Sequence, residues 1–95
     1  MSMKAAYEQK LRAQLDAWDA DIQKLKAQAR SAEADAQLQY DKEVARLQSM
    51  RDDAAARLSE LEAAGDDAWE DLKAGIENAW DSMTVAVKSA TSRFK

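Results

Sequence analysis

The chain has 95 residues, of which 34% are charged, and its formal net charge is −4. This length allows one structural unit with a small core. The negative balance argues against general nucleic-acid binding, which needs a positive field to displace counterions from phosphates. Histidine and cysteine are both absent, which removes the commonest general base and metal ligand as well as disulfide and thiol chemistry. We therefore predict no enzymatic activity, no metal, no cofactor and no small-molecule substrate.

The composition indicates an all-α protein. There is no proline, the only glycines are Gly65 and Gly75, and good helix formers such as Ala, Leu, Lys, Glu, Gln and Arg predominate. No stretch approaches the roughly 18 apolar residues of a membrane span. The N-terminal sequence MSMKAAYEQK lacks the apolar segment of a secretory signal. The expected location is the cytoplasm.

The first predicted element is a long helix over residues 3–63, within a heptad-type region 1–64. Its apolar positions alternate spacings of four and three residues, as in a coiled-coil seam, and an eleven-residue step from Ala36 to Leu47 forms a stutter. Arg51 occupies one seam position, where it either extends its charge to the edge or selects a partner. The large apolar residues of this stripe are Leu11, Leu15, Trp18, Ile22, Leu25, Tyr40, Val44, Leu47, Leu58 and Leu61.

A helix break is predicted at Gly65, followed by a shorter helix over residues 67–93. Glycine suits the position after a helix C-terminus because it adopts a left-handed conformation without a Cβ clash. Asp67, with Glu70 three residues later, resembles a capping box, and Asp66 adds negative charge near the new N-terminus. The alternative is one uninterrupted helix, in which an isolated glycine costs about 1 kcal/mol.

Residues 65–95 form an amphipathic region with an internal repeat. The segment AWEDLKAGIEN (68–78) aligns with AWDSMTVAVKS (79–89), and ATSRFK (90–95) begins a third copy. An eleven-residue repeat has about 3.67 residues per turn, so its apolar residues lie on one stripe of a nearly straight helix. That stripe consists of Trp69, Leu72, Ile76, Trp80, Met83, Val87 and Phe94.

The length of the first helix leads us to predict a homo-oligomer. About sixty helical residues give a rod of roughly 90 Å, which the shorter helix cannot cover. Side chains such as Leu15 and Ile22 would each gain roughly 1.5–3 kcal/mol from burial. The chain itself is therefore the expected partner, with the apolar residues of both stripes as the interface. The function predicted on this basis is a non-enzymatic structural, scaffold or stress-protective role.

The three tryptophans allow a second interpretation. Trp18, Trp69 and Trp80 lie on the stripes, where tryptophan usually anchors a core or an interface. An amphipathic helix with aromatic residues on one side can instead lie on a membrane, lipid-droplet or granule surface. Residues 67–95 are the candidate for that mode, although their first half is acidic and opposes anionic lipid.

Two acidic pairs are candidate metal ligands. They are Asp52–Asp53 and Asp66–Asp67. Adjacent residues on a helix point about 100° apart, so neither pair converges on one ion. A solvated face or a helix cap explains them better than a weak Ca²⁺ or Mg²⁺ contact.

The chain resembles a family of small bacterial coiled-coil proteins, often described as stress-response proteins or as proteins of unknown function. The matching stretches are YEQKLRAQLDAWDADIQKLKAQ, EADAQLQYDKEVARLQ and DDAWEDLKAGIENAWDSMTVAVKSATSRFK. They cover nearly the whole chain, and the C-terminal tryptophan-containing block is the most specific. The resemblance implies a bacterial, soluble, helical protein that is induced by stress and has no catalytic residues.

Overall fold

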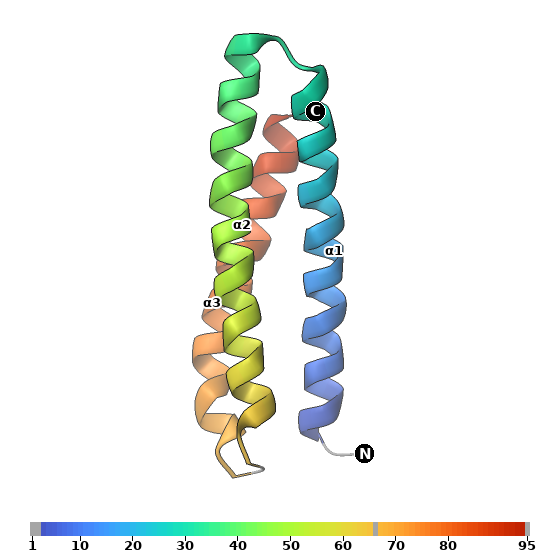
Figure 1. Ribbon diagram of the computed structural model, residues 1–95. Helices are drawn as coiled ribbons and strands as arrows, with labels where there is room; N and C mark the ends of the chain where they lie inside the picture. The colour runs from blue at the N-terminus through green and yellow to red at the C-terminus, as the bar shows by residue number, and fades with distance from the viewer. Residues whose placement is uncertain (1–2, 66, 95) are drawn as a thin grey trace.

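The computed structural model describes residues 3–65 and 67–94, which form an antiparallel bundle of three helices (Figure 1). Helix α1 spans Met3–Ser31, α2 spans Ala34–Ala63 and α3 spans Trp69–Arg93. Helix α2 runs back along α1, and α3 lies behind this pair and ends near the α1–α2 turn. The bundle is elongated, with extents of 51 × 20 × 19 Å. The all-α prediction is confirmed.

The predicted single helix over residues 3–63 is wrong, because the chain leaves the helix at Ala32 and Glu33. Glu33 is extended, with φ −65° and ψ 158°. The side-chain amide of Gln37 donates a hydrogen bond to the carbonyl oxygen of Ala29 at 3.2 Å. Every residue type in this segment is compatible with a helix, so local preference does not explain the turn. The turn forms because folding back lets α2 and α3 cover the apolar face of α1.

The second turn, residues 64–68, lies where the sequence predicts a break, but its details differ from the prediction. Gly65 does not adopt a positive φ. Its carbonyl oxygen accepts hydrogen bonds from the amides of Ala68 and Trp69, at 3.0 and 3.2 Å. The N-cap of α3 is Ala68 rather than Asp67, and it makes no side-chain capping bond. The left-handed glycine and the capping box are therefore both wrong predictions, and Asp66 lies outside the described residues.

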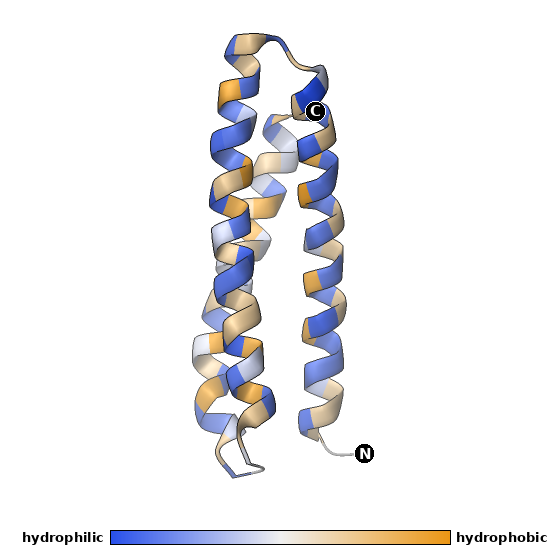
Figure 2. Ribbon diagram, viewed as in Figure 1, coloured by the Kyte–Doolittle hydropathy of each residue, from blue (hydrophilic) through white to orange (hydrophobic). Residues whose placement is uncertain are grey.

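The core runs along the whole bundle, and every buried side chain within residues 3–65 and 67–94 is apolar. The apolar stretches of α1 and α2 face each other across the bundle, and hydrophilic residues cover the outside (Figure 2). Leu47, Leu61 and Met83 are completely buried. Each large aliphatic side chain contributes roughly 1.5–3 kcal/mol on burial. Packing on this scale outweighs the small differences in helix propensity at the turns.

The apolar stripe of α1 is covered by its own chain, which corrects the prediction that only a companion could cover it. Leu15, Trp18 and Ile22 belong to one buried cluster with residues of α2 and α3. The prediction failed because it treated α1 and α2 as one rod, whereas the turn at Ala32 and Glu33 divides that rod in two. Self-association is not needed to hide this stripe, and the homo-oligomer stays a prediction.

Candidate functional site

The residues predicted to form an interface between copies lie in the core of one bundle. All of them are buried except Tyr40 and Leu72, which are partly buried and pack against the core. Sequence reasoning missed Tyr7 and Ala90, which also contribute to the core. Tyr7 lies four residues before Leu11, so extending the heptad pattern by one step would have found it. Ala90 has no comparable signal, because alanine is frequent on every face of the helices.

Three aromatic pairs hold α3 against the other two helices. The ring centroids are 5.8 Å apart in Tyr7–Trp69, 5.5 Å in Trp18–Trp80 and 4.3 Å in Tyr40–Phe94. All three pairs are tilted rather than face to face, a geometry that suits the charge distribution of aromatic rings and contributes about 0.5–1.5 kcal/mol beyond burial. All three tryptophans therefore anchor the core of the bundle.

Arg51 joins α2 to α1 at the edge of the core. Its Nε lies 2.8 Å from Oδ1 of Asp19, and its Nη2 lies 3.1 Å from Oδ2. The hydrogen bond to Asp19 raises the pKa of the Arg51 guanidinium, which stays protonated. Both side chains are partly exposed, so the pair contributes about 0.2–1 kcal/mol. Its main effect is to fix the register of α1 on α2, since a bidentate contact tolerates little sliding.

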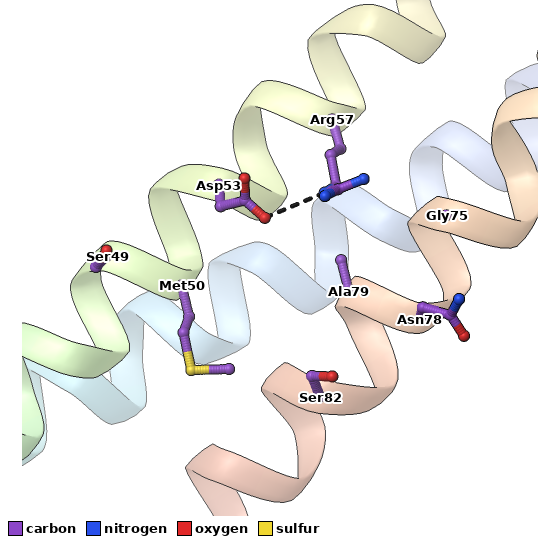
Figure 3. Close-up of a pocket in the computed structure, with 8 residues that line it drawn as sticks. All are labelled: Ser49, Met50, Asp53, Arg57, Gly75, Asn78, Ala79 and Ser82. Atoms are coloured by element: carbon purple, nitrogen blue, oxygen red, sulfur yellow. Dashed lines mark hydrogen bonds and ion pairs between the residues drawn. The ribbon is translucent and has the colours of Figure 1, made fainter.

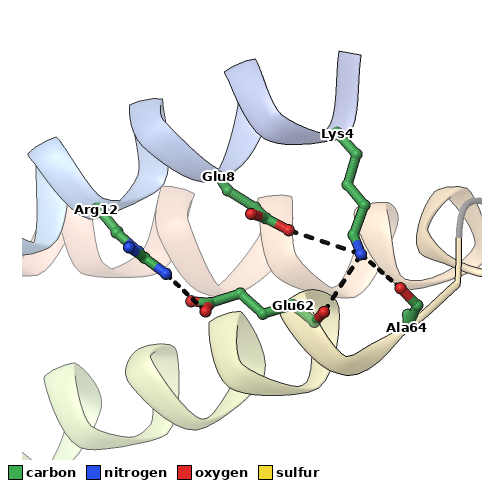
Figure 4. A network of polar contacts seen from close by, with 5 residues as sticks. All are labelled: Lys4, Glu8, Arg12, Glu62 and Ala64. Carbon is green, nitrogen blue, oxygen red and sulfur yellow. Dashed lines mark hydrogen bonds and ion pairs between the residues drawn. The ribbon is translucent and has the colours of Figure 1, made fainter. Parts of the chain in front are cut away.

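A second polar network joins the start of α1 to the end of α2 (Figure 4). Lys4 Nζ donates hydrogen bonds to the carbonyl oxygens of Glu62 and Ala64 and lies 3.7 Å from Oε1 of Glu8. Arg12 Nη2 lies 2.6 Å from Oε2 of Glu62. A lysine at a helix C-terminus satisfies free carbonyls and complements the negative end of the helix dipole. The network therefore closes the α1–α2 pair at the end remote from their turn.

An open groove of about 580 Å³ lies between α2 and α3 (Figure 3). Arg57 lies over Gly75, where an added Cβ would be 3.5 Å from Arg57 Nη1. Arg57 Nε also donates to Oδ2 of Asp53 at 3.1 Å. The residues lining the groove are Ser49, Met50, Asp53, Arg57, Gly75, Asn78, Ala79 and Ser82. The two charged groups in this lining, Asp53 and Arg57, are paired with each other.

A hollow of about 260 Å³ lies between α1 and α3, beside Tyr7. Burial raises the pKa of the Tyr7 phenol, and the nearby negative charge of Glu77 raises it further. Tyr7 therefore keeps its proton at neutral pH. The indole N–H of Trp80 in the same wall is buried and has no hydrogen-bond partner within the described part of the chain.

The described acidic pair, Asp52 and Asp53, faces arginines. Asp52 Oδ1 lies 3.5 Å from Nη1 of Arg51, and Asp53 pairs with Arg57. Across residues 3–65 and 67–94, no group of three or more acidic side chains could hold a metal ion. None of the helices in this part of the chain combines the length and apolar character that crossing a bilayer requires.

Comparison with protein-family models, with curated protein sequences and with solved structures found no match for this chain. The fold alone therefore defines the class of protein, an antiparallel three-helix bundle with an apolar core.

Proposed function

We propose that this bundle is a non-enzymatic protein with a structural, scaffold or stress-protective role, exerted through helix–helix association between copies of the chain. The observation that carries the proposal is the make-up of the α1–α2 seam. Its interior is apolar, and its edges carry the complementary pairs Arg51–Asp19 and Arg12–Glu62. In coiled coils, edge charges of this kind select the partner helix and its orientation. A second copy of the chain presents the same complementary edges.

Two exposed apolar side chains lie on the outer surface, away from the α1–α2 seam. Leu38 on α2 is 64% exposed and Val85 on α3 is 68% exposed. Single exposed apolar residues are common on monomeric proteins, so neither is itself evidence for association. They provide a control, because changing them leaves the core and both ion pairs intact.

The test is size-exclusion chromatography with light scattering over a range of protein concentrations from micromolar to millimolar. The proposal predicts that the average mass rises with concentration toward at least twice that of one chain. If association uses the α1–α2 seam, Val85→Glu and Leu38→Glu should associate like the parent protein. A protein that stays monomeric over the whole range contradicts the proposal.

Binding to an apolar surface through α3 is the second candidate function. The observation that favours it is the row of large apolar residues on one face of α3, including Trp69 and Trp80, which opening of the bundle would release. Because these tryptophans are already buried in the closed bundle, a blue shift of their fluorescence would not report lipid binding. Quenching of tryptophan by brominated lipid in neutral vesicles, together with co-flotation, would. Neither signal is expected if the bundle acts only by self-association.

A further inference from the structure

The α1–α2 turn lacks the residues that normally end a helix. It consists of Ala32 and Glu33, and neither glycine nor proline lies within the ten residues on either side. Glu33 is the N-cap of α2 but makes no side-chain capping bond. The side chain that does close the turn is Gln37, through its hydrogen bond to the carbonyl oxygen of Ala29. The backbone could therefore continue as a helix through this turn once this hydrogen bond and the packing of α1 on α2 and α3 are released.

The apolar faces of α1 and α2 would coincide in such a continuous helix. Four buried residues of α1 are each followed, 36 residues later, by a buried residue of α2. A separation of 36 residues is about ten turns of an α-helix, so the two members of each pair lie on the same side. The pairs are Leu11–Leu47, Trp18–Ala54, Ile22–Leu58 and Leu25–Leu61. The straight helix thus carries one continuous apolar stripe over both halves.

We propose that two copies of this chain exchange α1 by straightening the α1–α2 turn, which produces an antiparallel dimer with one helix over residues 3–63 in each copy. This inference rests on the proposed self-association and gives it a geometry. Helix α1 of one copy takes, on α2 and α3 of the other, the place it occupies in the single chain. The pairs Arg51–Asp19, Arg12–Glu62 and Trp18–Trp80 then form between copies, whereas the contacts of α2 with α3 stay within each chain.

The centre of this dimer follows from the ion pairs. In an antiparallel pair of identical helices, the midpoint of two paired positions lies at the twofold axis, and here it falls at small side chains. The midpoint of Asp19 and Arg51 is position 35, and the midpoint of Arg12 and Glu62 is position 37. Ala36 lies between these midpoints. In the dimer the two long helices therefore cross at alanines, where their backbones can approach closely. Because both halves of each stripe face the same side, the two α3 helices lie end to end on one face of the helix pair.

Replacing Ala34 by proline separates the closed and the straight forms. Ala34 is the first residue of α2, a position that proline tolerates because its amide has no partner within the helix. The residue before it, Glu33, already has the extended ψ of 158° that a following proline favours. In the straight helix, the same proline would remove a hydrogen bond and clash with the preceding turn. Ala34→Ser, which keeps the amide, is the matched control.

The experiment compares the parent protein, Ala34→Pro and Ala34→Ser after refolding from denaturant at high concentration, by light scattering and small-angle X-ray scattering. The parent and Ala34→Ser should form a dimer of doubled mass whose longest dimension is roughly 90 Å, at 1.5 Å per residue, against 51 Å for the single bundle. Ala34→Pro should remain a single bundle. A parent dimer no longer than one bundle would overturn the exchange and leave self-association standing, whereas a parent that is monomeric at every concentration would overturn both. An elongated dimer of Ala34→Pro would also overturn the exchange.

Cross-linking gives an answer that does not depend on the proline variant. The chain has no cysteine, so Asp19→Cys and Arg51→Cys can be made as two separate single variants and refolded together. The side chains at these two positions contact each other across the α1–α2 seam, and exchange brings them together from different chains. A short bis-maleimide reagent spans the space that the long arginine side chain fills, so we expect it to cross-link the two variants into a heterodimer. The absence of this product, when the same reagent cross-links the double variant within one chain, would overturn the exchange.

Discussion

The two turns of the bundle differ in how the sequence marks them. The α2–α3 turn contains Gly65 and acidic residues, whereas the α1–α2 turn at Ala32 and Glu33 is built from residues that favour a helix. Yet the α2–α3 turn does not use the glycine and the capping residue that its sequence offers, because Gly65 has no positive φ and Asp67 does not cap α3. The comparison teaches that local preferences permit both turns without specifying them, and that packing of the apolar stripe holds the chain in the folded-back form.

The largest expected effect comes from a change that removes burial and leaves both turns untouched. Ile22→Asp puts a charge among buried side chains, and we expect a loss of about 4 kcal/mol or more in the free energy of unfolding. Because packing holds both turns, helicity and the cooperative thermal transition in circular dichroism should fall together. Gln23→Asp, at an exposed neighbouring position, is the control and should melt like the parent. A folded Ile22→Asp protein with an unchanged melting temperature would refute the argument that packing holds the chain in the folded-back form.

Trp80→Ala should have the next largest effect, because Trp80 lies near the middle of α3 and packs on Trp18 at 5.5 Å between ring centroids. Truncating a buried tryptophan costs about 3–5 kcal/mol. Urea denaturation followed by circular dichroism measures this loss. Val85→Ala on the same helix, where the side chain is exposed, should change stability by less than about 0.5 kcal/mol. Equal effects of the two substitutions would show that Trp80 does not anchor α3.

At the α1–α2 turn, Gln37→Ala should lower the free energy of unfolding by about 0.5–1.5 kcal/mol, since it removes the side-chain hydrogen bond to the carbonyl oxygen of Ala29. Gln39→Ala is the matched control, because Gln39 is exposed in the same helix. The difference between their urea midpoints at constant slope measures the contribution of the bond. If the two variants have the same midpoint, Gln37 does not hold the turn closed.

At the α2–α3 turn, Gly65→Ala should have the smallest effect and should not destabilise the bundle. A Cβ at this position meets nothing within 4 Å, and the backbone φ is not positive. Alanine also restricts the unfolded chain, so the free energy of unfolding should rise by about 0.4–1 kcal/mol. Thermal melts of the parent and the variant test this. A loss of stability would mean that Gly65 needs a conformation that only glycine adopts readily, and it would reverse the comparison between the turns.

Much of the fold could be predicted from residue periodicity. The heptad spacing from Leu11 to Leu25, the stripe from Val44 to Leu61 and the eleven-residue repeat from Trp69 onward identify nearly all of the large buried side chains. The α1–α2 turn could not be predicted in this way. Because Ile22 and Leu58 are about ten helical turns apart, a continuous helix and a folded-back pair have the same apolar pattern. The pattern does not say whether α1 packs on α2 and α3 of its own chain, because those contacts join residues far apart in the sequence.

For the candidate sites too, the sequence pattern predicts which residues are buried but not which residues they contact. The interior position of Trp80 follows from its spacing, but its pairing with Trp18 depends on how α3 crosses α1. The groove beside Gly75 arises where small side chains of α3 meet α2, and composition alone does not place them opposite Met50. Side-chain periodicity assigns residues to the interior, whereas the partner across the interior depends on the axial position of each helix.

That axial position is set by the aromatic rings along α3. Trp69, Trp80 and Phe94 are separated by eleven and fourteen residues, which correspond to about three and four helical turns. Each ring meets a ring from a neighbouring helix. A slide of α3 by a single turn, about 5.4 Å, would part all three couples at once. The aromatic side chains therefore allow α3 a single axial register, in which all three rings are in contact with their partners at once.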